Sequence, residues 1–163
     1  MIYILSGPIR SGKTTALIDW INKRKDIDGI LSPDNHLGQR YFLEVGSFQR
    51  FDFEVKSYVE EETISIGRFH FLKSAFNRVN AYLAHILNSE NSKHIVVDEV
   101  GKLELKGKGL HDAVRQLISS QQFLRHRHLL LVIRESLLES VIQHYNITDY
   151  KVMTKETLSE TLF

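Results

Sequence analysis

Hydrophobic and polar positions form two kinds of block along the chain. Short, mostly apolar stretches indicate strands; they cover residues 2–5, 28–32, 94–98, 128–134 and 150–154. Between most of them, apolar residues recur every three or four positions, which is the spacing of an amphipathic helix, and the longest such pattern covers residues 71–87. Continuous apolar strands that alternate with helices predict an α/β fold, in which a mostly parallel sheet is flanked by helices.

The middle of the chain departs from this alternation. Residues 40–45 and 50–55 have the composition of strands, and Gly46-Ser47 between them favours a turn, so we expect an antiparallel hairpin. Residues 63–66 add a further short strand. We interpret this region, about 40–66, as an antiparallel excursion within one domain of residues 1–163, because no linker, repeat or low-complexity tract interrupts the chain.

The turn after the first strand has the pattern G-x-x-x-x-G-K-[ST]. Its residues are candidates for binding a nucleotide: Gly7, Pro8, Ile9, Arg10, Ser11, Gly12, Lys13, Thr14 and Thr15. A strand precedes the pattern and a helical pattern follows it, which is the context in which a phosphate-binding loop forms. An ordinary glycine-containing turn is the alternative, and the correct flanks disfavour it.

The residue types of this loop suit the negative charge of a triphosphate. Glycine at positions 7 and 12 lets the main chain turn tightly and approach the phosphates. The following helix directs free N–H groups and its positive dipole end at the anion. Lys13 would reach the β- and γ-phosphates and assist catalysis there, and the Thr14 hydroxyl would bind Mg²⁺.

The strand over 94–98 is followed by a second candidate feature, the acidic pair Asp98-Glu99. Ligands of a parallel sheet bind at the carboxyl ends of its strands, so we expect the pair beside the phosphate loop. Asp98 would bind or orient Mg²⁺ together with Thr14. Glu99 would orient or deprotonate a water aimed at the γ-phosphate. Such a pair alone is often a helix cap or a solvated turn, but next to a phosphate loop it predicts a nucleoside triphosphatase.

Bulk composition narrows the classes of partner. The 163 residues include 21 Lys and Arg against 20 Asp and Glu, and a net charge of +1 argues against duplex DNA or an anionic membrane surface. Basic clusters at 23–25 and 125–128 follow expected helices, and we interpret both as solvated helix ends. The chain has no cysteine, which excludes disulfides and thiol catalysis and agrees with a cytoplasmic location. No apolar run is long enough to cross a bilayer.

Together the two motifs resemble a family of small P-loop nucleoside-triphosphatases, the cancer-related nucleoside-triphosphatase type. The resemblance rests on the loop at 7–15 and on the sequence Val96-Val97-Asp98-Glu99-Val100-Gly101-Lys102-Leu103-Glu104-Leu105. It implies a three-layer, RecA-like fold and slow Mg²⁺-dependent hydrolysis of the β–γ bond of nucleoside triphosphates such as ATP and GTP, with little base preference. It makes Asp98 the metal-associated acid and Glu99 the base, but it gives no role to Lys102 or Glu104. The aromatic stretch at 32–51 departs from the family's pattern, so the base preference stays open.

Three further basic residues are candidates for stabilising charge in the transition state: Lys102, Arg134 and Arg68. Arg134 ends a central strand and could therefore face the site, and Lys102 follows the acidic pair. A surface or structural role is an equal alternative for each of them. A homo-oligomer that lends an arginine across its interface is a further alternative.

Three other functions are compatible with parts of the sequence. A GTP-dependent switch would use Asp98-Glu99-Val100-Gly101, which satisfies D-x-x-G, but no Asn-Lys-x-Asp motif follows to read guanine. A small-molecule kinase would need an acceptor pocket and usually an arginine-rich lid, and no clear lid is present. A nucleotide-binding regulatory or sensor module would use the same residues as a hydrolase.

Overall fold

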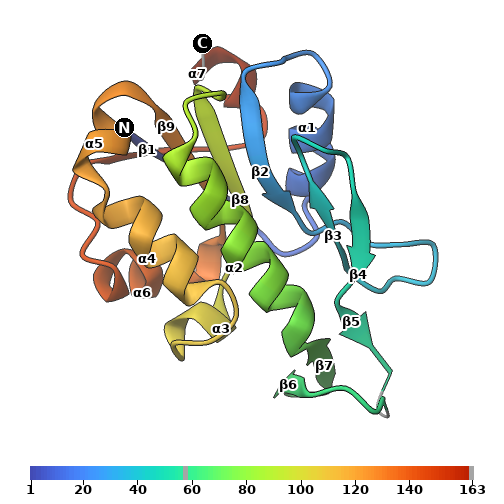
Figure 1. Cartoon of the computed structure of the whole chain (residues 1–163). Coiled ribbons are helices and arrows are strands. Elements are labelled where there is room, and N and C mark those ends of the chain that lie inside the picture. Colours follow the sequence, from blue (N-terminus) through green and yellow to red (C-terminus); the bar gives the residue numbers. More distant parts are fainter. Residues whose placement is uncertain (57–58, 162–163) are drawn as a thin grey trace.

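Within the described residues, the main sheet contains five parallel strands, and an antiparallel pair of strands extends one of its sides. The structure is a computed structural model, and it describes residues 1–56 and 59–161. In this part of the chain the strand order is β10-β1-β9-β8-β2-β3-β4 (Figure 1). The parallel strands are β10 (Tyr150–Met153), β1 (Ile2–Gly7), β9 (His128–Arg134), β8 (His94–Val100) and β2 (Ile27–Leu31). The antiparallel strands β3 (Tyr41–Glu44) and β4 (Arg50–Asp52) extend one edge. The predicted α/β fold is confirmed.

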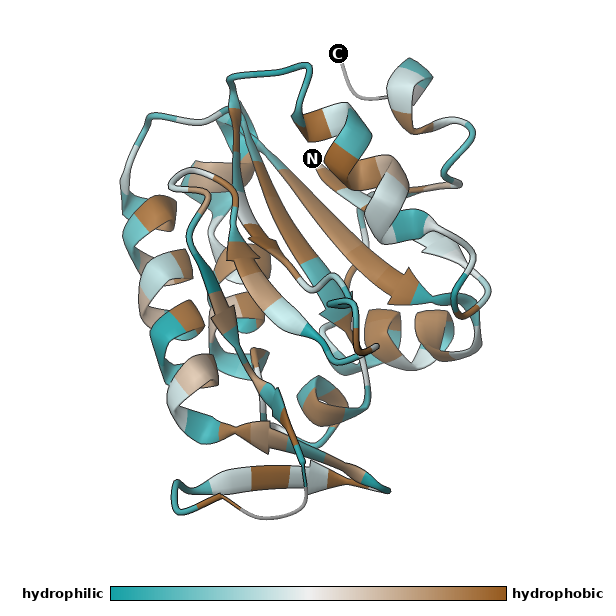
Figure 2. Cartoon of the chain, turned by 90° about the vertical axis from the view of Figure 1, so that its right-hand side faces the viewer, coloured by the Kyte–Doolittle hydropathy of each residue, from teal (hydrophilic) through white to brown (hydrophobic). Residues whose placement is uncertain are grey.

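Helices cover both faces of this sheet, which gives three layers (Figures 1 and 2). Successive residues of a strand point to opposite faces, so Val97 packs in the cluster with Val79 and Val114, whereas Val96 packs with Leu17. One face is covered by α1 (Lys13–Ile21) and α7 (Leu158–Thr161), and the other by α2 (Lys73–Asn88), α4 (His111–Ser119), α5 (Gln121–His126) and α6 (Leu138–His144). Two short helices, α3 (Lys102–Leu105) and η1 (Glu135–Leu137), follow the carboxyl ends of β8 and β9.

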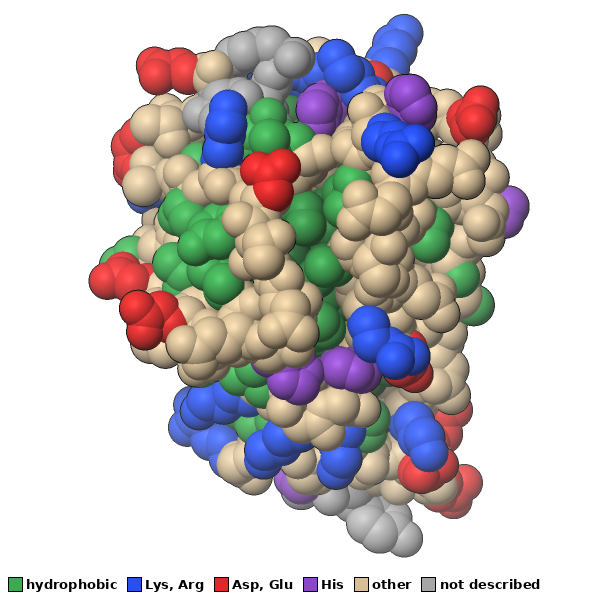
Figure 3. Space-filling view, turned by 90° about the vertical axis from the view of Figure 1, so that its left-hand side faces the viewer, with side chains coloured by type: hydrophobic (Ala, Val, Ile, Leu, Met, Phe, Trp, Pro, Cys, Tyr) green, Lys and Arg blue, Asp and Glu red, His purple; other side chains and the backbone are tan. Residues whose placement is uncertain are grey.

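The outer surface agrees with the near-neutral net charge. Figure 3 shows that acidic and basic side chains both occur on one flank of the molecule, among hydrophobic and uncharged groups. Among the described residues, no helix combines the length and the apolar character that crossing a membrane requires.

The antiparallel excursion is larger than the sequence predicts. The hairpin of β3 and β4 is confirmed, with Gly46-Ser47 in its turn, but the predicted strand at 50–55 is interrupted at Phe53. Beyond Phe53 the chain leaves the main sheet and forms a small antiparallel sheet in the order β5-β7-β6, from β5 (Glu54–Val55), β6 (Thr63–Ile66) and β7 (Phe69–Leu72). The antiparallel strands therefore continue to Leu72, and the second sheet lies beside the first turn of α2 (Figure 1).

The helix predicted over 71–87 begins later than expected, at Lys73. Phe71 and Leu72 belong to β7, where they pair with Ile64 and Thr63. Their apolar side chains continue the helical spacing by coincidence, because a short run of aromatic residues suits a strand as well as a helix.

The basic cluster at 125–128 is only partly a solvated helix end. Arg125 and His126 do lie in the last turn of α5. Arg127, however, is buried, and its guanidinium donates hydrogen bonds to the carbonyls of Ile86 and Ser89 at 3.2 and 2.6 Å. It satisfies carbonyl groups that the end of α2 leaves without intrahelical partners. The interpretation as a solvated end was wrong for this residue because its partners come from a distant helix.

Candidate active site

The phosphate loop joins β1 to the first turn of α1, as the sequence predicts. Its lysine lies against the loop itself: the Lys13 ammonium donates to the carbonyls of Pro8 at 2.6 Å and Gly7 at 3.1 Å. Arg10 and Gly12 have positive φ angles of 53° and 84°, so the loop turns through the left-handed region twice. Burial lowers the pKa of Lys13, although the neighbouring Asp98 and Glu99 act in the opposite direction.

The loop forms one side of a cleft of about 750 Å³. Residues 9–15 all line this cleft, and so do the acidic pair and residues of the antiparallel excursion. Gly7 and Pro8 are not among its lining residues but accept hydrogen bonds from Lys13. A cavity of this size and mixed polarity can hold a nucleotide-sized ligand.

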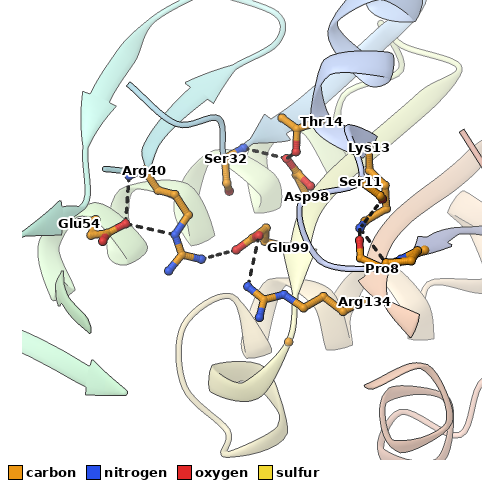
Figure 4. Close-up of polar contacts among 12 residues, drawn as sticks. Pro8, Ser11, Lys13, Thr14, Ser32, Arg40, Glu54, Asp98, Glu99 and Arg134 are labelled. Atoms are coloured by element: carbon orange, nitrogen blue, oxygen red, sulfur yellow. Dashed lines mark hydrogen bonds and ion pairs between the residues drawn. The ribbon is translucent and has the colours of Figure 1, made fainter. Parts of the chain in front are cut away.

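Asp98 connects the first turn of α1 to the segment that directly follows β2 (Figure 4). Its Oδ2 accepts hydrogen bonds from the Thr14 hydroxyl at 2.9 Å and from the Ser32 amide at 3.1 Å. The residue is 1% exposed, and burial together with the charge of Glu99 raises its pKa to about 6. Its other oxygen, Oδ1, is buried and has no hydrogen-bond partner among the described residues. A buried carboxylate oxygen without a partner, next to a threonine hydroxyl, suits a hard divalent cation such as Mg²⁺.

A β-bulge brings Asp98 and Glu99 into the same cleft. Consecutive residues of a regular strand would point to opposite faces of the sheet. The register between β8 and β9 shifts between Val97, which pairs with Leu131, and Val100, which pairs with Ile133. The backbone of Glu99 has a φ of 61°, in the left-handed region that residues other than glycine rarely adopt. The strand therefore does not end at the acidic pair, as the sequence suggested, but continues through it to Val100.

The carboxylate of Glu99 lies between two arginines (Figure 4). Arg134, at the end of β9, lines the cleft and places its Nη2 3.6 Å from Oε1. Arg40 donates from Nη1 to Oε2 on the other side. Sequence analysis missed Arg40, because it stands 59 positions before Glu99 and belongs to no motif. No spacing rule in the sequence links the two.

The remaining candidates occupy different places. Lys102 begins α3 and lines the cleft. Glu104 is buried, which raises its pKa, and its carboxylate accepts hydrogen bonds from the amides of Gly101 and Leu110 at 2.8 and 2.9 Å. This motif residue therefore fixes the loop after β8. Arg68 lies on the exposed turn between β6 and β7, 5.2 Å from the centre of the Phe69 ring, and it is not among the residues that line the cleft.

A second lysine approaches the phosphate loop from the C-terminal part of the chain. Leu5 of β1 pairs with Met153 of β10, so the segments that follow these parallel strands lie side by side at the carboxyl end of the sheet. The Lys155 ammonium donates to the carbonyl of Ser11 at 2.6 Å. Sequence analysis did not single out this lysine, although the pairing of the two strands would have placed it there.

Comparison with known proteins agrees with this geometry. A family model described as NTPase matches residues 2–160. Among solved structures, THEP1 from the hyperthermophile Aquifex aeolicus has the same fold, with a TM-score of 0.73 and 17% sequence identity, over 98% of this chain and 93% of that one. No curated protein sequence matches the chain. Because the family model covers almost all of its length, the chain belongs to this NTPase family of P-loop nucleoside-triphosphatases.

Proposed function

We propose that the protein hydrolyses the β–γ bond of nucleoside triphosphates with the help of Mg²⁺ and releases a nucleoside diphosphate and phosphate. One observation carries the proposal: Asp98 and Glu99 both line the cleft, and Asp98 accepts a hydrogen bond from the Thr14 hydroxyl at the start of α1. Two carboxylates in these positions match the two needs of the reaction, a metal ligand and a group that orients water.

The phosphate loop would bind the triphosphate through its amides and Lys13. The ammonium of Lys13, which contacts two loop carbonyls, would exchange them for oxygens of the β- and γ-phosphates. Thr14 and Asp98 would hold Mg²⁺, which supplies positive charge to the phosphate oxygens when bound.

Glu99 would orient the attacking water and accept its proton. The water oxygen forms a bond to the γ-phosphorus while the bond to the bridging oxygen breaks, and that oxygen leaves with its electron pair on the diphosphate. Lys13 and the loop amides stabilise the charge that develops there. Arg134, 3.6 Å from Glu99, adds positive charge on the same side of the cleft.

We extend the proposal to several bases, because the contacts that support it all lie at the phosphate end of a nucleotide. A small-molecule kinase is the second candidate, and one observation favours it. The lining of the cleft also includes apolar side chains, among them Phe69, Phe71 and Leu103, against which an acceptor could lie. A homo-oligomer and a cytoplasmic location stay predictions from the sequence.

The test is phosphate release from ATP, GTP, CTP and UTP, with Mg²⁺ or with a chelator, for wild type and Glu99→Gln. We expect Mg²⁺-dependent release by the wild type with all four nucleotides. Glu99→Gln should bind nucleotide normally but release phosphate about 10²- to 10⁴-fold more slowly. Tight binding by the wild type without release of phosphate would contradict hydrolysis and favour the kinase or a sensor module.

A further inference from the structure

The guanidinium of Arg40 joins two carboxylates that come from different sheets. Its Nε donates to Oε2 of Glu54 at 3.2 Å, and its Nη1 donates to Oε2 of Glu99 (Figure 4). The backbone amide of Arg40 donates to the same oxygen of Glu54 at 3.0 Å. Glu54 therefore fixes both the main chain and the side chain of Arg40, and Arg40 in turn contacts Glu99.

The surroundings of Arg40 are apolar. Its guanidinium carbon lies 4.9 Å from the ring centre of Phe71, 5.5 Å from that of Phe69 and 5.8 Å from that of Phe53. The side chains of Arg40 and Glu54 are only 18% and 12% exposed. Ion pairs are less screened where water is scarce, and a planar guanidinium can stack on aromatic rings while it donates in its own plane. The charge of Arg40 is thus held in one place.

The two arginines beside Glu99 are not equally well fixed. Arg134 is 36% exposed and its Nη2 lies 3.6 Å from the carboxylate, beyond a direct hydrogen bond. Arg40 makes the closer contact and is anchored by Glu54 and three rings. The orientation of the Glu99 carboxylate therefore depends mainly on Arg40.

We infer that Arg40 is a positioning residue for hydrolysis, whose guanidinium holds the Glu99 carboxylate in the orientation that the attacking water needs. The inference rests on the proposed role of Glu99. Two of the three guanidinium nitrogens, Nε and Nη1, donate to carboxylates, and we therefore assign the role of Arg40 to its contact with Glu99. The segment that carries its anchors, β5 to β7, thereby contributes to turnover without forming the phosphate loop.

The first experiment compares phosphate release and ATP binding for wild type, Arg40→Met and Arg50→Met. Arg50 is the matched control: it lies on β4, its guanidinium is 5.4 Å from the ring centre of Tyr41, and it does not line the cleft. Arg40→Met should lower kcat about 10- to 100-fold, as loss of a group that orients an active-site ligand typically does. Its affinity for ATP should stay within about threefold, because the lost contact is not to the nucleotide. The inference would be overturned if Arg40→Met had the same kcat as Arg50→Met. It would also be overturned if Arg40→Met lost ATP affinity by the same factor as kcat.

A second variant separates positioning from folding. Arg40→Met leaves the mostly buried Glu54 carboxylate with a backbone amide but without its charged partner, which itself destabilises the protein. The double variant Arg40→Met/Glu54→Gln removes that unpaired charge, so its thermal midpoint should return toward the wild-type value while kcat stays low. Recovery of kcat together with stability would show that Arg40 serves stability alone.

Single-turnover measurements in the Glu99→Gln background test whether Arg40 acts through Glu99. If it does, adding Arg40→Met should change the residual rate by less than about twofold, because residues that act as a unit are not additive. A full 10- to 100-fold effect in this background would contradict the inference while leaving the proposed function intact. Failure of the proposed function gives a different result, which is wild-type turnover by Glu99→Gln alone.

Discussion

The parallel core and the antiparallel excursion contribute different parts of one cleft. The core supplies the phosphate loop, Asp98 and Glu99 at the carboxyl ends of parallel strands. The excursion, which we define as residues 40–72, supplies Arg40, Glu54 and aromatic rings on the other side. The core positions its groups through strand pairing, whereas the excursion positions them through side-chain contacts between distant segments. Apart from Glu99, we expect changes in the core to affect folding and nucleotide affinity, and we expect changes in the excursion to affect turnover through Glu99.

The largest difference between the regions should come from two glycines. Gly29 on β2 has a φ of 132°, and a Cβ there would lie 2.0 Å from the carbonyl oxygen of Val96 on β8. Gly29→Ala should therefore destabilise the protein by more than about 4 kcal/mol or prevent folding, because two paired backbones would have to separate. Gly67, in the turn between β6 and β7 of the excursion, has a φ of 56° and open space around it, so Gly67→Ala should cost only about 1 kcal/mol. Urea unfolding measures both, and a smaller loss for Gly29→Ala would contradict the comparison.

The end of the core opposite the site should make stability depend on pH. His94 begins β8 and is buried, and burial lowers its pKa to about 4 although Asp26 opposes the shift. Between pH 6.5 and 4 the unfolded chain binds a proton that the folded protein does not, so stability falls as the pH falls. The loss from this residue should be on the order of 3 kcal/mol across that range. Measured by urea unfolding from pH 7 to pH 4, the free energy of unfolding should depend less steeply on pH for His94→Gln than for wild type. Equal slopes would contradict a role for His94 in this pH dependence.

Lys13 and Arg40 test the division between affinity and turnover directly. Lys13→Ala removes the charge that would meet the phosphates, so it should weaken ATP binding about 100-fold, or about 2.7 kcal/mol. Arg40→Met should leave ATP affinity nearly unchanged. Binding can be measured by calorimetry in the presence of Mg²⁺. If both variants lost ATP affinity to the same extent, the proposed separation, in which Lys13 determines affinity and Arg40 determines turnover, would be wrong.

The smallest expected effect concerns Lys155, which approaches the loop from beyond β10. Its ammonium is partly exposed and contacts the carbonyl of Ser11, so it should add a modest attraction for the phosphates. Lys155→Met should weaken ATP binding about threefold, as for exposed charge pairs. Lys151 is the control, since it is an exposed lysine on the preceding strand β10, and Lys151→Met should bind as wild type does. Equal affinities for the two variants would exclude a role for Lys155.

The sequence predicted those parts of the fold and of the site that local patterns determine. The apolar strands, the phosphate loop and the acidic pair follow from side-chain spacing and from the rule that ligands lie at the carboxyl ends of parallel strands. The contacts of Arg40 and the burial of Arg127 could not be predicted, because their partners are distant in sequence and share no motif with them. The strand β7 was missed because Phe71 and Leu72 also fit the helical spacing of α2.

The β-bulge in β8 has a consequence for how this site can change. In a regular strand, the side chains of two neighbouring residues cannot both point to the same face of the sheet. The extra residue at Asp98-Glu99 lets them do so, in exchange for a left-handed backbone at Glu99. Deletion of a single residue here would restore the alternation and turn one carboxylate out of the cleft. Such a chain would retain its phosphate loop but lose the water-orienting group, so it would bind a nucleotide without hydrolysing it.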